Sequence, residues 1–338
     1  MLVSVPFVGS AHHARVEYDS SQVVELEGTV ESVKWMNPHV RLILRVSGDD
    51  AAVWQLEGMD MSRLDRAGVP RDLLKVGDTI RVSGDPSTRR ANRMFVRHVL
   101  LPDHRELLLV VGRKPLWSEN VIGSDYPYNS MPKITIGETP EGIFRVWFPH
   151  FRDGLGAFAK SPPFTSEGRA SYDAYDNIVD DPVLGCTPPG MPKLVTRAGV
   201  RPIEFEKWKN LILIKVEAFG LVREIDMSGR RPDVSKKPRP LGYSVGRWEE
   251  DTLIIETTKI DWPRFQLYGF EGAPQSTSAM ITERYEFREE DNRLIYSIML
   301  DDPVNFTEVI NAEGYQTYEW REGQRLIPFY ECGTEFTL

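Results

Sequence analysis

The first third of the chain alternates apolar and polar side chains in short runs. A period of two turns one face of each run toward a core, as β-strands do. Asn37-Pro38 and Gly48-Asp49-Asp50 interrupt the runs where turns belong, and Asp60 is a good N-cap for a short helix. The predicted elements are strands at 24–31, 40–46, 53–56, 79–83 and 94–101, with a helix over 61–67 between the third and the fourth. Three strands, a helix and two strands are the order of an OB fold, a five-stranded barrel.

The second half predicts many more short strands. They lie at 201–207, 211–218, 221–227, 243–248, 252–259, 279–288, 293–300, 304–311 and 315–321. Upstream, a hairpin is expected with one arm at Ile134–Ile136 and the other over 144–148, followed by a helix over 166–175 with Thr165 as its cap. Regular spacing with few helices favours a larger antiparallel barrel of about eight strands. A barrel of that size holds side chains or one small ligand.

A chain of 338 residues is long enough for two domains. We place an OB-like domain at 20–105, a connector rich in Pro and Gly at 106–130, and the barrel domain at 131–338. Residues 1–19 are interpreted as the remnant of a signal peptide followed by an arm, because Leu2–Val8 is apolar and Gly9-Ser10-Ala11 suits a cleavage site. This predicts a periplasmic or secreted protein. An ordinary N-terminal strand is the alternative.

Charge narrows the range of partners. With 50 acidic and 41 basic side chains the net charge is −9, which argues against a nucleic-acid partner. Arginines gather at 89–93, with Arg97 following, and are interpreted as a solvated hairpin tip, an anion-binding patch being the alternative. No run is long enough to span a membrane. The sequence sets no oligomeric state.

The two cysteines, Cys186 and Cys332, lie far apart in the second half. Without a C-x-x-C pair they do not form a thiolate zinc site. In an exported protein they predict a disulfide between the start of the second module and its last strand. The chain-entropy model gives such a long loop roughly 4–5 kcal/mol of stabilisation. Two inert buried thiols are the alternative.

Several motifs resemble the DUF6152-type proteins, exported bacterial proteins of unknown function. The resemblance rests on residues 11–13, 17–19, 26–30, 35–40, 162–165, 180–184, 186–192, 242–248 and 283–285. It implies export, an OB-like module and a lipocalin-like second barrel, and it implies no chemistry. Relatives commonly carry histidine where this chain has Arg231, Tyr243, Gln275 and Gly333, so no role of those histidines transfers to it.

Three histidines are candidates for a metal site. If cleavage follows Ala11, His12 begins the mature chain, and its amine and ring could chelate a metal with His13 and His39. Such nitrogen donors suit Cu(II) first and Zn(II) next. Copper or zinc there is the only cofactor that the sequence suggests. A polar N-terminal arm with a surface histidine is the alternative.

The larger barrel is the other candidate site, because aromatic residues are dense in its strands. A cavity with aromatic walls and a few polar groups is the usual small-molecule site, although most aromatics simply form a core. The candidate ligand-binding residues are Trp208, Glu217, Arg223, Tyr243, Trp248, Glu283, Tyr285 and Trp320. Glu283 and Arg284 are neighbours on one strand, so only one of them faces inward. Candidate acid–base residues are Glu283, Tyr243 and Asp226.

Motifs of the common enzyme classes are missing, including the G-x-S-x-G elbow, the Walker-A loop, the Rossmann glycines and H-E-x-x-H. We therefore expect an exported protein that binds a small apolar or aromatic molecule in the second barrel. One alternative is an isomerase, cyclase or lyase using a carboxylate and a tyrosine in the same barrel. Metal handling by the N-terminal histidines is another. A buried carboxylate near a tyrosine hydroxyl would favour the enzyme. A purely apolar cavity would favour a protein that only binds and carries its ligand, and a barrel without a cavity would favour a structural role.

Overall fold

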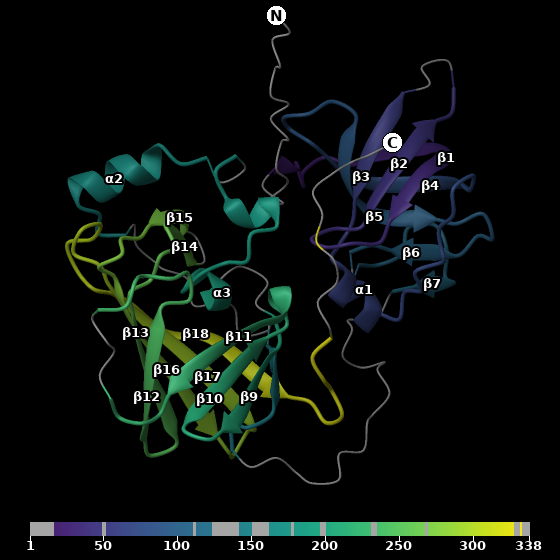
Figure 1. Ribbon diagram of the computed structural model, residues 1–338. Coiled ribbons are helices and arrows are strands. Elements are labelled where there is room, and N and C mark those ends of the chain that lie inside the picture. The colour runs from purple at the N-terminus through teal and green to yellow at the C-terminus, as the bar shows by residue number, and fades with distance from the viewer. Residues whose placement is uncertain are drawn as a thin grey trace, which may run out of the picture. The chain divides into compact units, whose positions relative to one another are not determined.

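The computed structural model describes residues 17–48, 52–110, 113–123, 142–150, 162–176, 179–196, 201–230, 235–267, 270–327 and 332. The chain divides into two compact units. The first comprises residues 1–132 with 181–187 and 330–338, and the second comprises 133–180 and 188–329. Strand dominates both units, which confirms the all-β prediction (Figure 1).

The first unit contains the predicted OB-like barrel. Its elements are β1 (Val24–Lys34), β2 (Arg41–Val46), β3 (Val53–Glu57), α1 (Met61–Arg66), β4 (Thr79–Pro86) and β5 (Arg93–Leu100). The strands run in the order β3-β2-β1-β4-β5, and a parallel pairing of β3 with β5 closes five strands into a barrel. A Cβ at Gly28 would lie 2.2 Å from the carbonyl oxygen of Arg45, so glycine lets β1 and β2 approach there.

Much of the expected connector belongs to the same sheet. β6 (Glu106–Leu108) pairs with β5, and β7 (Val121–Ile122) pairs with β6. Glu106 has no exposed surface, and its carboxylate accepts hydrogen bonds from the backbone N–H groups of Leu116, Trp117 and Ser118 at 2.7–3.0 Å. This anchor ties the loop between β6 and β7 to the barrel.

Cys186 and Cys332 form the predicted disulfide. Its location differs from the prediction, because both cysteines belong to the first unit and Cys332 follows the last strand instead of lying in it. Cys186 ends the 3-10 turn Pro182–Gly185 in a left-handed conformation (φ 66°), and Cys332 forms an isolated β-bridge with Asn37. The disulfide therefore fastens two segments distant in sequence to the OB-like barrel.

The second unit is a closed barrel of nine strands. They are β8 (Val146–Pro149), β9 (Ile203–Trp208), β10 (Leu211–Val216), β11 (Leu221–Asp226), β12 (Tyr243–Glu249), β13 (Thr252–Thr258), β16 (Met280–Arg288), β17 (Arg293–Asp301) and β18 (Ile310–Trp320). Neighbouring strands pair antiparallel except β11 and β12, which run parallel over two residue pairs. β8 is the second arm of the predicted early hairpin, and the first arm lies outside the described residues.

One long strand replaces the last two predicted ones. The prediction of a strand at 304–311 is wrong for its first part, because Asp302 organises a loop there. Its carboxylate accepts hydrogen bonds from the backbone N–H of Ser276 (2.8 Å), from the Ser276 hydroxyl (2.7 Å) and from Asn305 Nδ2 (2.8 Å). β18 then continues through a bulge that contains Gly314 (φ 56°), which the strand prediction read as a break.

Four short elements cover one end of the barrel (Figure 1). They are α2 (Ser166–Asp173), α3 (Lys193–Thr196), β14 (Arg264–Leu267) and β15 (Phe270–Pro274). Thr165 caps α2 as predicted, accepting a hydrogen bond from Gly168 N at 3.0 Å. α3 packs against β14 and α2 against β15. Within the described ranges β14 and β15 pair only with each other, so this cover is not part of the barrel's ladders.

Candidate functional site

A buried ion pair lies inside the nine-stranded barrel. Arg223 of β11 and Glu283 of β16 are 2% and 0% exposed, and two parallel hydrogen bonds join them. One, from Arg223 Nη1 to Glu283 Oε1, is 3.0 Å long, and the other joins Nη2 to Oε2. Such a bidentate pair fixes the orientation of both groups. Strand alternation therefore turns Glu283 inward and leaves its neighbour Arg284 exposed.

Hydroxyl groups from four strands surround this pair. Arg223 also donates to Ser244 Oγ on β12 at 3.1 Å and to Thr257 Oγ1 on β13 at 2.6 Å. The hydroxyls of Tyr296 and Tyr285 donate to Glu283 Oε1 at 3.2 and 3.5 Å. The carboxylate and the guanidinium are thus both partnered, as buried charges must be.

We call the ion pair and these four hydroxyl-bearing residues the polar layer of the barrel. Burial shifts the pKa values of its arginine and its two tyrosines. Burial by itself would lower the pKa of Arg223, but the charge of Glu283 and its hydrogen bonds outweigh it, and the pKa is raised. Burial first, and then the Glu283 charge, raise the pKa of Tyr285 and Tyr296 well above the usual range. Both phenols are therefore neutral hydrogen-bond donors, and both carboxylate oxygens of Glu283 accept hydrogen bonds from Arg223.

Tyr318 of β18 departs from this pattern of satisfied groups. It is fully buried, its pKa is raised by burial first and then by Tyr315 and Glu283, and its hydroxyl has no hydrogen-bond partner in the part of the chain that the structure describes. Tyr315 next to it donates to the carbonyl oxygen of Thr196 in α3 at 2.6 Å. The Tyr318 hydroxyl is thus a buried hydrogen-bond donor beside the polar layer that finds no acceptor among the described residues.

Several candidates lie elsewhere. The interior placement of Trp208 and Trp248 is wrong, because they are 47% and 42% exposed at strand ends. Tyr243 faces outward, since its neighbour Ser244 faces inward, and its hydroxyl donates to the Lys237 carbonyl. Asp226 is at the outer end of β11, where it accepts from Ser228 N.

The last two candidates have structural contacts at the margins of the barrel. Glu217 is buried just beyond β10 and accepts a hydrogen bond from Ile327 N at 2.8 Å. Trp320 packs at the end of the barrel where β16 turns into β17. There the Arg145 guanidinium carbon lies 5.2–5.4 Å from the ring centres of Trp147, Phe287 and Trp320. Arg145 Nη1 also donates to Asn292 Oδ1 at 2.9 Å, so this stack closes that end.

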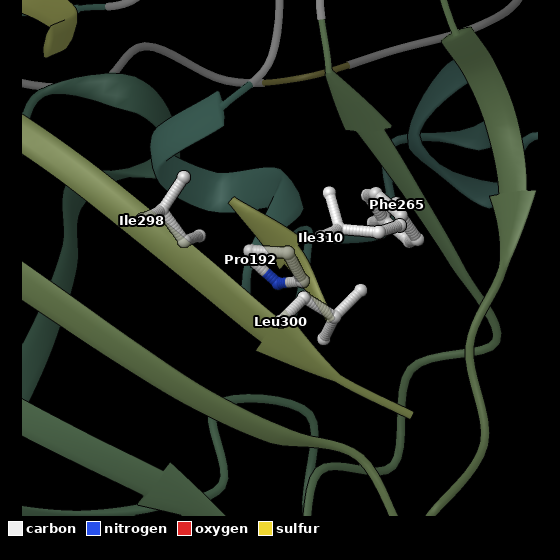
Figure 2. A pocket seen from close by; sticks show the side chains of 5 residues that line it. All are labelled: Pro192, Phe265, Ile298, Leu300 and Ile310. Carbon is white, nitrogen blue, oxygen red and sulfur yellow. The ribbon is translucent and has the colours of Figure 1, made fainter. Parts of the chain in front are cut away.

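At the opposite end, an apolar cleft lies between the barrel and its cover. Pro192, Phe265, Ile298, Leu300 and Ile310 line it, and Figure 2 shows their side chains around one space. No part of the cleft is wide enough to take the centre of a water molecule. Phe265 belongs to β14 of the cover and Pro192 immediately precedes α3, whereas the other three residues belong to β17 and β18.

Strand register relates the cleft to the polar layer. Glu283 stands directly opposite Ile298 in the β16–β17 ladder, and residues paired in this way share a face of the sheet. The next inward pair toward the cover is Ile281 with Leu300. The apolar cleft therefore lies next to the layer that holds Glu283 and Arg223.

The proposed metal ligands are not brought together in what the structure describes. His12 and His13 lie outside the described residues. His39 is half-buried, donates from Nδ1 to the Gly58 carbonyl at 2.8 Å, and has its pKa lowered mainly by burial. Nowhere in the described ranges do three His, Cys, Asp or Glu side chains form a group able to hold a metal ion.

Sequence reasoning selected Arg223, Glu283 and Tyr285, which the structure does bring together. It missed the hydroxyls of Ser244, Thr257 and Tyr296 as their partners. A signal was present, because Ser244 and Thr257 occupy inward positions of strands that are otherwise apolar on that face. Polar residues at such positions indicate an internal network.

Comparison with known proteins adds a family for the N-terminal part. Residues 1–94 match DUF6152, a family of unknown function. This confirms the resemblance over the OB-like region, and the motifs quoted from the second half lie outside the match. No curated protein and no solved structure matches the chain. Among the described residues no helix has both the length and the apolar character to cross a membrane. The disulfide is typical of a protein outside the cytoplasm.

Proposed function

We propose that this is an exported, periplasmic or secreted, protein whose nine-stranded barrel binds a small apolar or aromatic molecule. The observation that carries the proposal is the cleft between barrel and cover, all five of whose lining residues are apolar. Ligand sites are usually apolar concavities with a few polar groups nearby. Here the polar groups are supplied by the adjacent layer of Glu283, Arg223 and the tyrosines.

The lining of the cleft limits the chemistry of the ligand. All five side chains around it are apolar, so a small apolar or aromatic molecule suits it better than a charged one. Since no part of it now admits a water molecule, binding requires the cover to move outward. α3 and the β14–β15 hairpin form no ladder with the barrel in the described ranges, so they can move without breaking its strand pairing.

The same geometry favours binding over acid–base catalysis. An enzyme working through Glu283 and a tyrosine needs both groups to be within hydrogen-bond reach of a substrate. Arg223 holds Glu283 through two hydrogen bonds, and the raised pKa of Tyr285 and of Tyr296 keeps both phenols protonated. These groups are arranged to donate hydrogen bonds and to stiffen the barrel.

The test uses the full chain purified from its own host and examined by native mass spectrometry, followed by calorimetric titration with toluene and with indole. We expect a bound organic mass, or binding of at least one probe with a negative heat-capacity change. Ile310→Phe fills the cleft and should weaken binding at least tenfold. Val309→Phe is the matched control, because Val309 is adjacent in sequence and 48% exposed.

Overpacking alone destabilises a core by about 1–3 kcal/mol. Affinities are therefore compared only at a temperature at which both variants are shown, by their melting curves, to be folded. A protein that carries no organic mass and binds neither probe would refute the proposal. Equal affinity of the probes for Ile310→Phe and for the unaltered chain would refute this site.

A further inference from the structure

One loop of the barrel unit is strongly basic within an acidic protein. The described residues between β11 and β12, 228–230 and 235–240, hold four Lys and Arg and no acidic residue, so they carry +4. The whole chain carries −9, which leaves −13 on the rest. Lys236, Lys237 and Arg239 are all exposed, and Arg230 has 81% of its side chain in solvent.

The loop is held in place at its C-terminal side. Arg239 N donates to the Lys259 carbonyl at 3.1 Å, and Asp261 N donates to the Arg239 carbonyl at 2.9 Å. The Tyr243 ring has Lys236 Nζ at 4.6 Å and the Arg239 guanidinium at 4.2 Å from its centre. These contacts hold two cations on one outward-facing ring, so the positive charge has a defined place on the barrel.

Acidic groups offset only part of this charge. Arg230 lies 3.8 Å from Asp226, whose pKa is lowered mainly by hydrogen bonds from Ser228 and further by the charges of Arg230 and Lys236. Asp261 is exposed near Arg239, and Lys259 adds a cation beside it. Lys236, Lys237 and Arg239 thus remain an excess of positive charge.

We propose that this basic loop docks the protein onto the anionic phosphate headgroups of a lipid bilayer. The cations stand on an exposed loop and do not converge on a pocket, so they suit an extended anionic surface more than a single small anion. A nucleic acid fits less well, because the Tyr243 ring is already covered by cations instead of being open to stack bases. Screening limits attraction and repulsion to about 8 Å at physiological salt, so the acidic remainder does not prevent local docking.

The test is co-sedimentation of the full chain with vesicles of 30% phosphatidylglycerol in phosphatidylcholine and with pure phosphatidylcholine vesicles. We expect binding to the anionic vesicles alone, weakening steeply as salt rises. Lys236→Gln with Lys237→Gln should lower the partition coefficient roughly 30-fold, the effect of two cations at a membrane surface. Both side chains are exposed, and the Lys237 carbonyl that Tyr243 contacts is unaffected.

The matched control is Lys207→Gln with Lys209→Gln, which removes the same charge from exposed lysines at the β9–β10 turn. It should bind as the unaltered chain does. Equal loss in both double variants would show a general charge effect and overturn the proposal. So would equal binding to the two vesicle types, or binding to inorganic polyphosphate as tight as to the anionic vesicles.

Discussion

Alkaline pH should unfold the nine-stranded barrel through its buried tyrosines. Tyr285, Tyr296 and Tyr318 lie in its interior, and burial raises the pKa of each above the ordinary value of 10. A group whose pKa is raised in the folded state stabilises that state, and this stabilisation is fully present at any pH below the group's pKa in the unfolded chain. That stability is lost as pH rises above 10, because the unfolded chain then releases protons that the folded chain retains.

The magnitude follows from the number of such groups. Each buried tyrosine lowers the free energy of unfolding by about 1.4 kcal/mol per pH unit above pH 10, so three lower it by about 4 kcal/mol per unit. With a stability of about 5 kcal/mol the barrel should unfold near pH 11, and a more stable barrel should unfold at a higher pH. In the first structural unit Tyr18 is also buried, and burial and Glu57 raise its pKa. This single tyrosine should lower the free energy of unfolding of that unit by only about 1.4 kcal/mol for each pH step of one above pH 10.

The assay is urea unfolding at several pH values between 9 and 11.5, read by circular dichroism and by tyrosinate absorbance at 295 nm. Tyr318→Phe should reduce the slope by about a third without loss of a hydrogen bond. Ile298→Val, a core change without a titratable group, should shift the midpoint and leave the slope unaltered. Titration of the three phenols near pH 10 in a barrel that remains folded would refute the reasoning.

Four further predictions concern stability. Arg223→Met or Glu283→Leu alone should cost about 3–5 kcal/mol, and the double variant less than the sum by about 3 kcal/mol, measured by a double-mutant cycle in urea. At neutral pH Tyr318→Phe should be neutral or stabilising, whereas Tyr296→Phe should cost about 1 kcal/mol, which thermal melts would show. Burial acts to raise the pKa of Glu106, but N–H donors at Leu116, Trp117 and Ser118 together with His98 lower it overall, so Glu106→Gln should cost the first unit about 1.5–3 kcal/mol at pH 7 and less as pH falls below 4.5. Cys186→Ser with Cys332→Ser should lower the free energy of unfolding of the first unit by up to about 5 kcal/mol. Calorimetry should show this as a lower melting temperature of the first unit, with the melting temperature of the barrel unchanged.

Local patterns were enough to predict most strands, because alternation and turn residues act over a few positions. The OB-like order and the strands around Glu283 follow from those signals. β18 shows their limit, since Gly314 marks a bulge inside a strand and not a turn between two. The loop before it depends on Asp302 accepting hydrogen bonds from Ser276, a partner 26 residues away that no local pattern reveals.

The site was harder to predict from sequence. A side chain near the end of a strand is buried only if the enclosed part of the barrel extends that far, and the sequence does not show where the enclosed part ends. Trp208 and Trp248 were expected inside because aromatic residues are dense in the strands of the larger barrel. Trp208 is the last residue of β9 and Trp248 the next-to-last residue of β12, and both are exposed. The cleft was not predicted at all, since it joins Pro192 and Phe265 to β17 and β18. Only the folded chain brings these segments together.

The two ends of the barrel differ in a way that bears on the proposed binding of a ligand. At the end where β16 turns into β17, Arg145 is stacked on three aromatic rings and hydrogen-bonded to Asn292. Opening that end would expose the rings and break a partly buried cationic contact. At the other end β14 and β15 pair, in the described part of the chain, only with each other, and Gln275, which follows β15, donates from Nε2 to the Met191 carbonyl at 3.0 Å. If the barrel binds a ligand as proposed, we therefore expect the covered end, next to the apolar cleft, to be the one that opens.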